Sequence, residues 1–393
     1  MKRSRSSKLP VNAATGSSIF SIPSCLLMEI LSKLPMSTIC NCRCVCSYFR
    51  NLISDPQFAQ LHLSTSQPSL MFWDRRWDCI VHLIELIHPC LDPVGANNRY
   101  APRILRFKPK CDVPTAELEV LSSCNGLICF YWPRTYNPYV ICNPVINEHV
   151  IVPQMEKVFF DQCGSGFGFC SRTNQYKMLR LLSPSIGFGV PGLIKLEAEI
   201  NTVGTNLWRR VGDAPRYLHW YSGGCFLNGS LHWIVHDTEN CFESMCCFDF
   251  GKERFQPFPG PSQFRGLPGQ LRVEMMKMGV LKDGLSVFHH PNCYMLDIWV
   301  MKDYAVRESW TKDFVIKLPW VATYFGYIYQ PLMVLNNGVI LMVYALSVLL
   351  SCNTMDNNSF RKFMVNGISS FARAMTYIPS FVSIKNAARG SYS

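Results

Sequence analysis

The sequence has few charged residues and no apolar run long enough to cross a membrane as a helix. Charged side chains make up 17% of the 393 residues and hydrophobic side chains 48%, which favours a packed core over disorder. The apolar stretch from Val339 to Leu350 is well short of the roughly 20 residues that a membrane-spanning helix needs. We therefore expect a buried pair of strands there, and no membrane association.

Acidic residues are missing from the start of the chain, where Glu29 is the first carboxylate. No apolar segment follows the basic first residues, so we expect a short disordered basic tail over 1–18 rather than a secretory signal. An organelle-transit interpretation of this tail stays open. The 38 basic and 27 acidic residues are spread along the chain, which argues against a nucleic-acid partner.

Cysteine is abundant but too dilute for a disulfide-rich secreted scaffold, with 19 in the whole chain. We expect reduced, mostly buried thiols and a location in the cytoplasm and/or the nucleus. Four cysteines, Cys40, Cys42, Cys44 and Cys46, alternate in sequence. Residues two apart on a helix point in different directions, so these thiolates cannot converge on one tetrahedral ion. No metal and no cofactor are expected.

Motifs that carry catalysis are also missing. The sequence has no G-x-S-x-G elbow and no H-E-x-x-H pair, and Gly164, Gly166 and Gly168 lack the spacing and the following helix of a phosphate loop. We expect these glycines to serve a turn or close strand packing, and His232 and His236 to pack or to pair with the backbone. The sequence thus predicts that the chain is not an enzyme and has no catalytic residues.

Helical periodicity is confined to the N-terminal part. Apolar residues at positions 27, 30, 31 and 34 form one stripe of a helix that begins after Pro23 and ends before Pro35. A second helix is expected to begin with Ser37 as its N-cap and to end before Asp55, with apolar residues three and four positions apart. A two-helix hairpin is too small to be stable alone, so its stripes must pack on the following domain or on another protein.

The segments Ile22 to Pro35 and Cys42 to Phe58 resemble the F-box motif of plant F-box proteins. The resemblance implies a helical module over 19–62 that docks on a Skp-type adaptor and, through it, on a cullin-based ubiquitin ligase. Phe49 stands where the family usually has Trp, and Ser47 where it usually has a basic residue. The residues that the resemblance assigns to adaptor binding are Pro23, Leu26, Leu27, Ile30, Leu31, Leu34, Pro35, Val45, Cys46, Phe49, Leu52, Ile53, Pro56 and Phe58.

From about residue 63 onward, short runs rich in β-branched and aromatic residues alternate with Asn, Gly, Pro and Asp, which indicates an all-β domain. A tight-turn dipeptide before an apolar strand recurs, and its glycines lie 103, 55 and 54 residues apart. The four copies are Asn125-Gly126, Asn228-Gly229, Asp283-Gly284 and Asn337-Gly338. A period near 50 with four strands per unit predicts a β-propeller. We expect about six blades, the sixth closed by Pro68 to Trp73 and Phe381 to Ile384.

The same part of the chain resembles the F-box-associated, kelch-like domain that follows the F-box in many plant proteins. The segments that carry the resemblance are Ser123 to Cys129, Gly166 to Phe169, Tyr176-Lys177, Trp208 to Arg210, Phe226 to Trp233, Leu296 to Lys302 and Glu308 to Thr311. We expect Trp208, Trp233, Trp299 and Trp310 to pack within or between blades.

The expected fold is mainly β with a small α module, in which the F-box helical hairpin precedes a kelch-like propeller. A linker with the first propeller strands is expected over 63–115, the propeller-like domain over 116–386 and a tail over 387–393. The implied function is the substrate-recognition subunit of an SCF-type ubiquitin ligase that binds an unknown target protein. The alternative is a propeller that binds a ligand or a glycan, with the hairpin as a structural cap.

Overall fold

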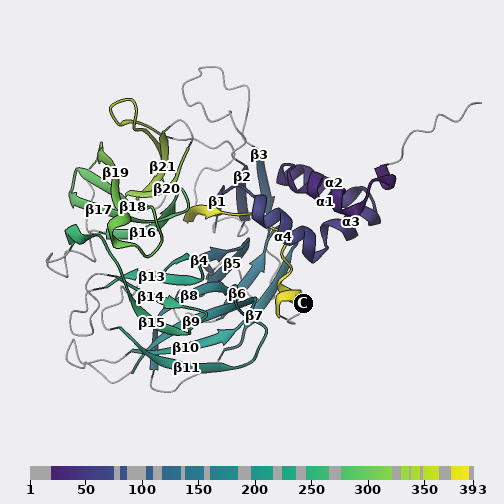
Figure 1. The fold of residues 1–393 in the computed structure, drawn as a ribbon, viewed down its shortest axis with the longest axis horizontal. Coiled ribbons are helices and arrows are strands. Elements are labelled where there is room, and N and C mark those ends of the chain that lie inside the picture. Colours follow the sequence, from purple (N-terminus) through teal and green to yellow (C-terminus); the bar gives the residue numbers. More distant parts are fainter. Residues whose placement is uncertain are drawn as a thin grey trace, which may run out of the picture.

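A computed structural model of the chain describes residues 19–74, 80–85, 103–108, 117–133, 138–154, 160–184, 196–215, 224–235, 245–264, 276–320, 329–335, 338–345, 348–362 and 373–388. Four short helices form a module that projects from a β-propeller (Figure 1).

The helical module follows a short 3-10 turn, Ile19–Ser21. Its helices are α1 (Ser24–Ser32), α2 (Met36–Val45), α3 (Ser47–Ile53) and α4 (Pro56–Thr65). Prolines set three of the helix starts. Pro23 and Pro35 are extended residues that directly precede α1 and α2, and Pro56 opens α4, where its missing N–H costs no hydrogen bond. The carboxylate of Asp55 caps α4 by accepting a 2.8 Å hydrogen bond from the backbone N–H of Gln57.

The expected single helix that begins at Ser37 and ends before Asp55 is wrong, because the chain breaks at Cys46. This residue is extended, with φ −157° and ψ 169°, and separates α2 from α3. The break lets Ile39 of α2 and Phe49 of α3 both enter the core. Ser37 also lies inside α2 instead of capping it.

Six four-stranded antiparallel sheets make up the propeller, and each is one blade. The first blade contains β4 (Glu119–Cys124), β5 (Leu127–Tyr131), β6 (Tyr139–Asn143) and β7 (Glu148–Val152). The second contains β8 (Phe160–Cys170), β9 (Gln175–Pro184), β10 (Leu196–Thr202) and β11 (Trp208–Ala214). The third contains β12 (Cys225–Leu227), β13 (Ser230–Ile234), β14 (Met245–Asp249) and β15 (Arg254–Phe258).

The fourth blade contains β16 (Met276–Leu281), β17 (Gly284–Asn292), β18 (Met295–Met301) and β19 (Trp310–Lys317). The fifth contains β20 (Tyr329–Val334), β21 (Val339–Tyr344), β22 (Val348–Asn353) and β23 (Ser359–Lys362), so the predicted strand pair within 339–350 is confirmed. The sixth contains β24 (Arg373–Tyr377), β1 (Ser69–Asp74), β2 (Ile80–Glu85) and β3 (Arg103–Phe107). Short 3-10 turns lie at Ser262–Phe264 and Arg307–Ser309, and a last helix, α6, spans Ile384–Ala388.

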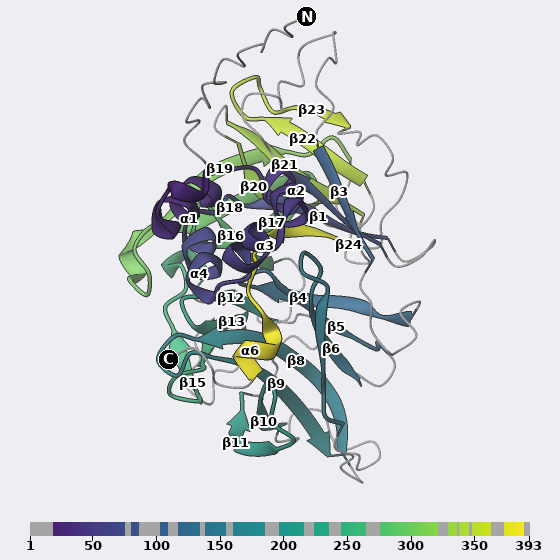
Figure 2. The same cartoon turned by 90° about the vertical axis from the view of Figure 1, so that its right-hand side faces the viewer.

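The blades form a closed ring. The edge strands β4, β8, β16, β20 and β24, together with the β12–β13 hairpin, contact one another in sequence around the centre, and we call them the inner strands. The six sheets surround this centre in Figure 2. The mainly β, six-bladed architecture predicted from the repeat period is therefore confirmed.

Both parts of the chain contribute to the closing blade. In the register of β1 and β24, Ser69 lies opposite Tyr377 and Trp73 opposite Arg373. The expected closing strand at Phe381 to Ile384 is wrong. After Tyr377 the chain leaves the sheet, and Phe381 and Ile384 are buried in the core that the helices share with the propeller.

Two of the predicted tight turns are confirmed. Asn125 and Gly126 have φ values of 50° and 77°, and Asn228 and Gly229 have 48° and 73°. In the fourth blade the turn residues are instead Lys282 and Asp283, and Gly284 already pairs in β17. Asn337 lies outside the described residues.

Candidate functional sites

The structure divides the residues that the sequence assigns to adaptor binding into three groups. The buried ones are Leu27, Leu31, Phe49, Leu52, Ile53 and Phe58. The half-buried ones are Leu34, Pro35, Cys46 and Pro56. The exposed ones are Pro23, Leu26, Ile30 and Val45. Only part of the predicted set is thus available to a partner in this conformation, and that division was not visible from periodicity.

Helix α1 carries two apolar stripes with opposite surroundings. Leu27 and Leu31, four residues apart, are 3% and 5% exposed and enter the core. Leu26 and Ile30 form the neighbouring stripe and are 50% and 53% exposed. Val45, at the end of α2, is 71% exposed. We call Leu26, Ile30 and Val45 the exposed apolar set.

Helix α4 connects the module to the propeller. The ring of Phe381 packs against those of Phe58 and His62 at centroid distances of 5.6 and 5.1 Å. Burial lowers the pKa of His62 to about 4, so this imidazole is neutral at pH 7. The hydroxyl of Ser66 donates to the backbone carbonyl of Pro379 at 3.3 Å. These contacts hold α4 against the chain that follows β24.

Residues 378–388, which we call the C-terminal strap, are fixed to the first blade. The amide of Asn143 donates to the carbonyls of Ser380 and Val382 at 3.0 and 2.9 Å. The hydroxyl of Ser383 donates to the carboxylate of Glu148 at 2.7 Å. The strap thus lies between α4 and the propeller (Figure 1), which fixes the helical module relative to the ring. Sequence reasoning missed this role because it assigned these residues to a strand.

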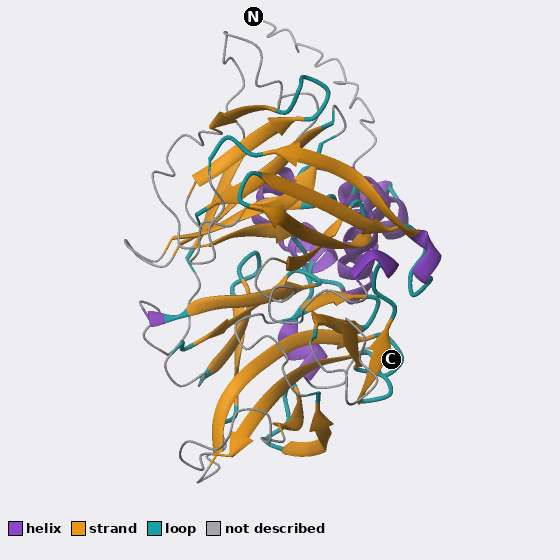
Figure 3. Cartoon of the chain, turned by 90° about the vertical axis from the view of Figure 1, so that its left-hand side faces the viewer, coloured by secondary structure: helices purple, strands orange, loops and turns teal. Residues whose placement is uncertain are grey.

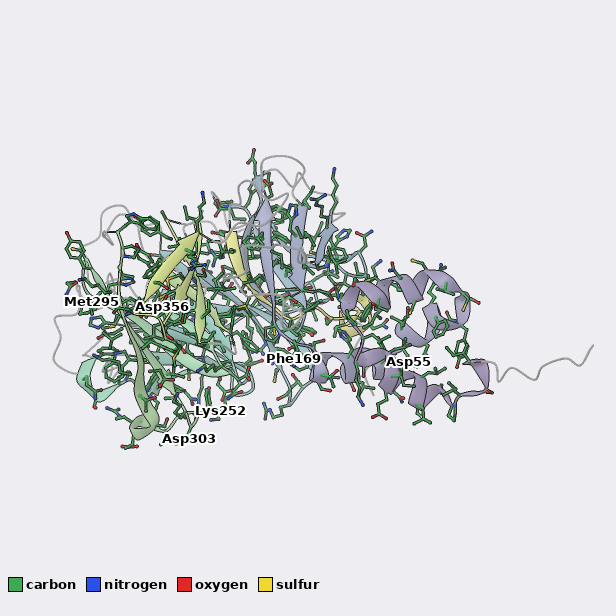
Figure 4. The ribbon with its side chains drawn as sticks, turned by 90° about the horizontal axis from the view of Figure 1, so that it is seen from above. Asp55, Phe169, Lys252, Met295, Asp303 and Asp356 are labelled. Atoms are coloured by element: carbon green, nitrogen blue, oxygen red, sulfur yellow. The ribbon has the colours of Figure 1, made fainter. Side chains whose placement is uncertain are left out.

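The helical module covers one face of the propeller. The backbone N–H of Ser37 contacts the carboxylate of Glu85 at 3.4 Å, at the end of β2. The strap lies beside the turn after β4, where the hydroxyl of Ser380 donates to the carbonyl of Asn125 at 2.7 Å. The helices lie in front of the ring in Figure 2 and behind it in the opposite view of Figure 3. Met295, at the start of β18, and Asp55, in the helices, lie at opposite ends of the molecule in Figure 4. We call the side on which the inner strands begin the far face.

Polar contacts that the sequence did not predict lie within the second blade and between the second blade and the third. Arg180 and Glu199 are opposite each other on β9 and β10, fully buried, with 2.6 Å between Nη2 and the carboxylate. Lys177 crosses from the second blade to the third, where Nζ donates to the carbonyl of Phe250 at 3.1 Å and to the carboxylate of Glu253 at 2.7 Å. These pairs serve the structure of the propeller, because the opposite charges of the two partners neutralise each other inside the protein.

Two tryptophans repeat one blade-to-blade contact. The indole N–H of Trp208 donates to the carbonyl of Pro153 at 2.8 Å, and that of Trp310 donates to the carbonyl of Pro259 at 2.9 Å. Each bond runs from the first residue of an outer strand to the end of the preceding blade. The predicted packing role of these two side chains is confirmed.

The other candidate motifs also serve packing. Gly164, Gly166 and Gly168 lie within β8, and a Cβ on Gly168 would approach ring carbons of Phe250 and Phe226 closer than atoms can pack. The ring of His232 is buried, with Nδ1 3.0 Å from the carbonyl of Cys225 and Nε2 2.9 Å from the hydroxyl of Tyr304. His236 lies outside the described residues.

Thiols and metal-ligand geometry give no site in the part of the chain that the structure describes. Every described cysteine is a free thiol, and burial raises the pKa of Cys40 to about 11. Cys42 and Cys44 share α2 with Cys40, whereas Cys46 lies in the break after it. Among the described residues, no three His, Cys, Asp or Glu side chains are grouped so as to hold a metal ion. Within the same residues, no helix combines the length and the apolar character needed to span a membrane.

Comparison with known proteins decides the family. A family model described as an F-box associated beta propeller domain matches residues 100–384, and the F-box domain model matches residues 19–61. The chain belongs to the F-box proteins that carry an F-box-associated β-propeller. The predicted resemblance is confirmed in both halves and in their order.

Related F-box proteins are found in Arabidopsis thaliana. One F-box protein is 26% identical over 402 residues, which cover 92% of each chain, and an F-box/kelch-repeat protein is 24% identical, covering 92% of this chain and 95% of the relative. F-box protein CPR1 is 24% identical, and the alignment covers 78% of this chain and 75% of the relative. An oligogalacturonate lyase structure from Vibrio parahaemolyticus aligns with 8% identity over 62% of this chain and 64% of that chain. Its TM-score of 0.36 is too low to indicate a shared activity.

Proposed function

We propose that this F-box protein is the substrate-recognition subunit of an SCF-type ubiquitin ligase. In this role the F-box binds a Skp-type adaptor, and through it a cullin, while the propeller binds a target protein. The chain contributes proximity and no chemical step, because it raises the effective concentration of the target near the conjugating enzyme. Such a complex acts in the cytoplasm or the nucleus.

One observation carries this proposal. The F-box helices bury one apolar stripe against their own core and leave the exposed apolar set, Leu26, Ile30 and Val45, uncovered. Large apolar side chains that stay open on a small module are typical of a docking surface. A hairpin that served only as a cap for a ligand-binding propeller would bury both stripes of α1, so the open stripe favours docking over the cap alternative.

The test is capture of a purified Skp-type adaptor by the full-length chain. Because Ile30 lies in the open stripe, Ile30→Asp places a charge where the adaptor would cover an apolar side chain. We expect at least about tenfold weaker capture, the loss typical of a central interface residue. Leu26→Asp should have the same effect.

Met355→Asp is the matched control, since Met355 is an apolar propeller residue that is 83% exposed. It should bind the adaptor as the unchanged chain does. If the chain captures no Skp-type adaptor, or if Ile30→Asp and Leu26→Asp bind it normally, the proposal is wrong.

A further inference from the structure

Two basic side chains lie at the far-face end of the inner-strand ring. Lys277 is the second residue of β16, and Arg373 is the first residue of β24. Each of these strands contacts β20, which lies between them in the ring. The inner strands begin on the far face, so both cations lie at the end of the ring that is turned away from the helices.

Neighbouring groups balance the positive charges of these two side chains only weakly. Burial, together with repulsion from Arg373, lowers the pKa of Lys277. The side chain of Arg373 is exposed, and Tyr131 and Glu119 of the first blade favour its charged form. The Glu119 carboxylate is itself 3.5 Å from the hydroxyl of Tyr131. The side chains of Lys277 and Arg373 form no hydrogen bond and no ion pair with the residues that the structure describes.

Two mutually repelling cations, one of them half-buried, lower the stability of the fold unless an anion joins them. A carboxylate or a phosphate placed near both would favour their charged forms and form strong, charge-assisted hydrogen bonds with them. Arg373 is exposed and Lys277 half-buried, so both can be reached from solvent.

Aromatic side chains occupy the same face. Tyr294, in the turn between β17 and β18, is 56% exposed, and Trp320, after β19, is 48% exposed. The backbone N–H of Leu318 donates to the carbonyl of Tyr294 at 2.8 Å, and the backbone N–H of Trp320 is bonded to the hydroxyl of Tyr329 at 3.2 Å. Because Tyr329 begins inner strand β20, Trp320 is fixed next to the ring. Exposed Tyr and Trp side chains are typical of protein-binding surfaces.

We propose that the far-face end of the ring binds an acidic segment of the target protein, whose anionic side chain lies between Lys277 and Arg373. This inference rests on the proposed function and names the chemistry of the target that the propeller takes. The shared chemistry is a side-chain anion, which is either a carboxylate or a phosphate.

The full-length chain is titrated with three fluorescent peptides of one sequence that carry Glu, Gln or phosphoserine at the same positions. The Glu peptide should bind, and the Gln peptide should bind at least about tenfold more weakly. Lys277→Met and Arg373→Met should each weaken Glu-peptide binding by about tenfold. The phosphoserine peptide distinguishes the two anions, because tighter binding with the same loss in both variants assigns phosphorylated side chains.

Lys362→Met is the matched control, because Lys362 is an exposed lysine at the end of outer strand β23. It should bind the Glu peptide normally. Thermal unfolding shows that the variants fold, and Lys277→Met should be at least as stable as the unchanged chain, since it removes a repelling charge. The proposal is overturned if the unchanged chain binds neither anionic peptide, if the Gln peptide binds equally well, or if Lys277→Met and Arg373→Met bind like Lys362→Met.

Adaptor capture is measured on the same variants. Lys277→Met should capture the adaptor normally, because the helices lie on the other face of the ring. Loss of peptide binding with normal capture separates this site from the F-box. Anionic-peptide binding by a chain that captures no adaptor would contradict the proposed ligase role and leave the anion site standing.

Discussion

At the scale of the residue, neighbouring positions of α1 have different roles. Leu27 and Leu31 stabilise the module from inside, whereas Leu26 and Ile30 face outward. Periodicity predicted a helix here, and this is confirmed, but the predicted single stripe is wrong, because Ile30 faces outward and Leu34 lies beyond the end of α1. It could not predict which stripe meets the protein's own core, because that depends on the break at Cys46 and on packing against residues far away in sequence.

Substitutions at these positions should separate stability from docking. Leu31→Ala should lower the free energy of unfolding of the helical module by about 2–5 kcal/mol, the usual loss for a buried leucine. Ile30→Ala should change it by less than about 0.5 kcal/mol. Urea unfolding of the full chain, followed by hydrogen exchange in α1, measures both values. Equal effects would contradict the assignment of the two stripes.

Buried histidines predict how stability depends on pH. Burial lowers the pKa of His62 and that of His232 to about 4, from an ordinary value near 6.5. The unfolded chain therefore binds protons at a pH at which the folded chain does not. Stability from each neutral histidine is fully present above about pH 6.5 and is lost as the pH falls to about 4, by on the order of 3 kcal/mol per residue. Thermal melts across this range should show a steep fall that His62→Gln makes shallower, and an unchanged slope would contradict the burial of His62.

At the scale of the element, the C-terminal strap is the feature that the sequence concealed. Its residues resemble a short strand in composition, and the register of the closing blade could not be derived from a single apolar run. By contrast, strands flanked by repeated turn dipeptides were predictable, because Asn-Gly adopts the positive φ values of a two-residue hairpin. The turn at Lys282 and Asp283 was displaced by one residue from the predicted Asp-Gly pair, since the pairing of Leu281 with Gly284 sets the register.

Loosening the strap should free the helical module without opening the ring. Phe381→Ala removes the ring that packs on Phe58 and His62, and we expect it to cost about 3–5 kcal/mol at this contact. Hydrogen exchange should become faster in α4, while β8 and β9 of the second blade stay protected. Ile378→Ala is the control in the same segment, because the side chain of Ile378 is exposed. Exchange that rises equally in every blade would show that the strap supports the ring and not the module.

At the scale of the whole molecule, the ring depends on strands from both parts of the chain. The repeat spacing predicted the number of blades because each blade buries its faces only against its neighbours, so every unit must preserve the same turns and apolar strands. The positions of the two faces could not be predicted. A repeat of about 50 residues determines how each blade packs on its neighbours, but it does not determine which end of the ring the helices contact.

The order in which the chain is synthesised adds a consequence. Ser66 and Pro379, which hold α4 to the strap, are 313 residues apart in sequence. Helices α1 to α4 therefore leave the ribosome long before Phe381 and β24 exist, and the edge of β1 that pairs with β24 stays open until then. During this interval Phe58 and His62 of α4 lack the ring of Phe381 that packs on them. Translation that terminates before residue 373 would release a chain with an open edge on β1 and a helical module that the strap does not hold. We expect such a chain to aggregate or to bind chaperones and not to keep partial activity.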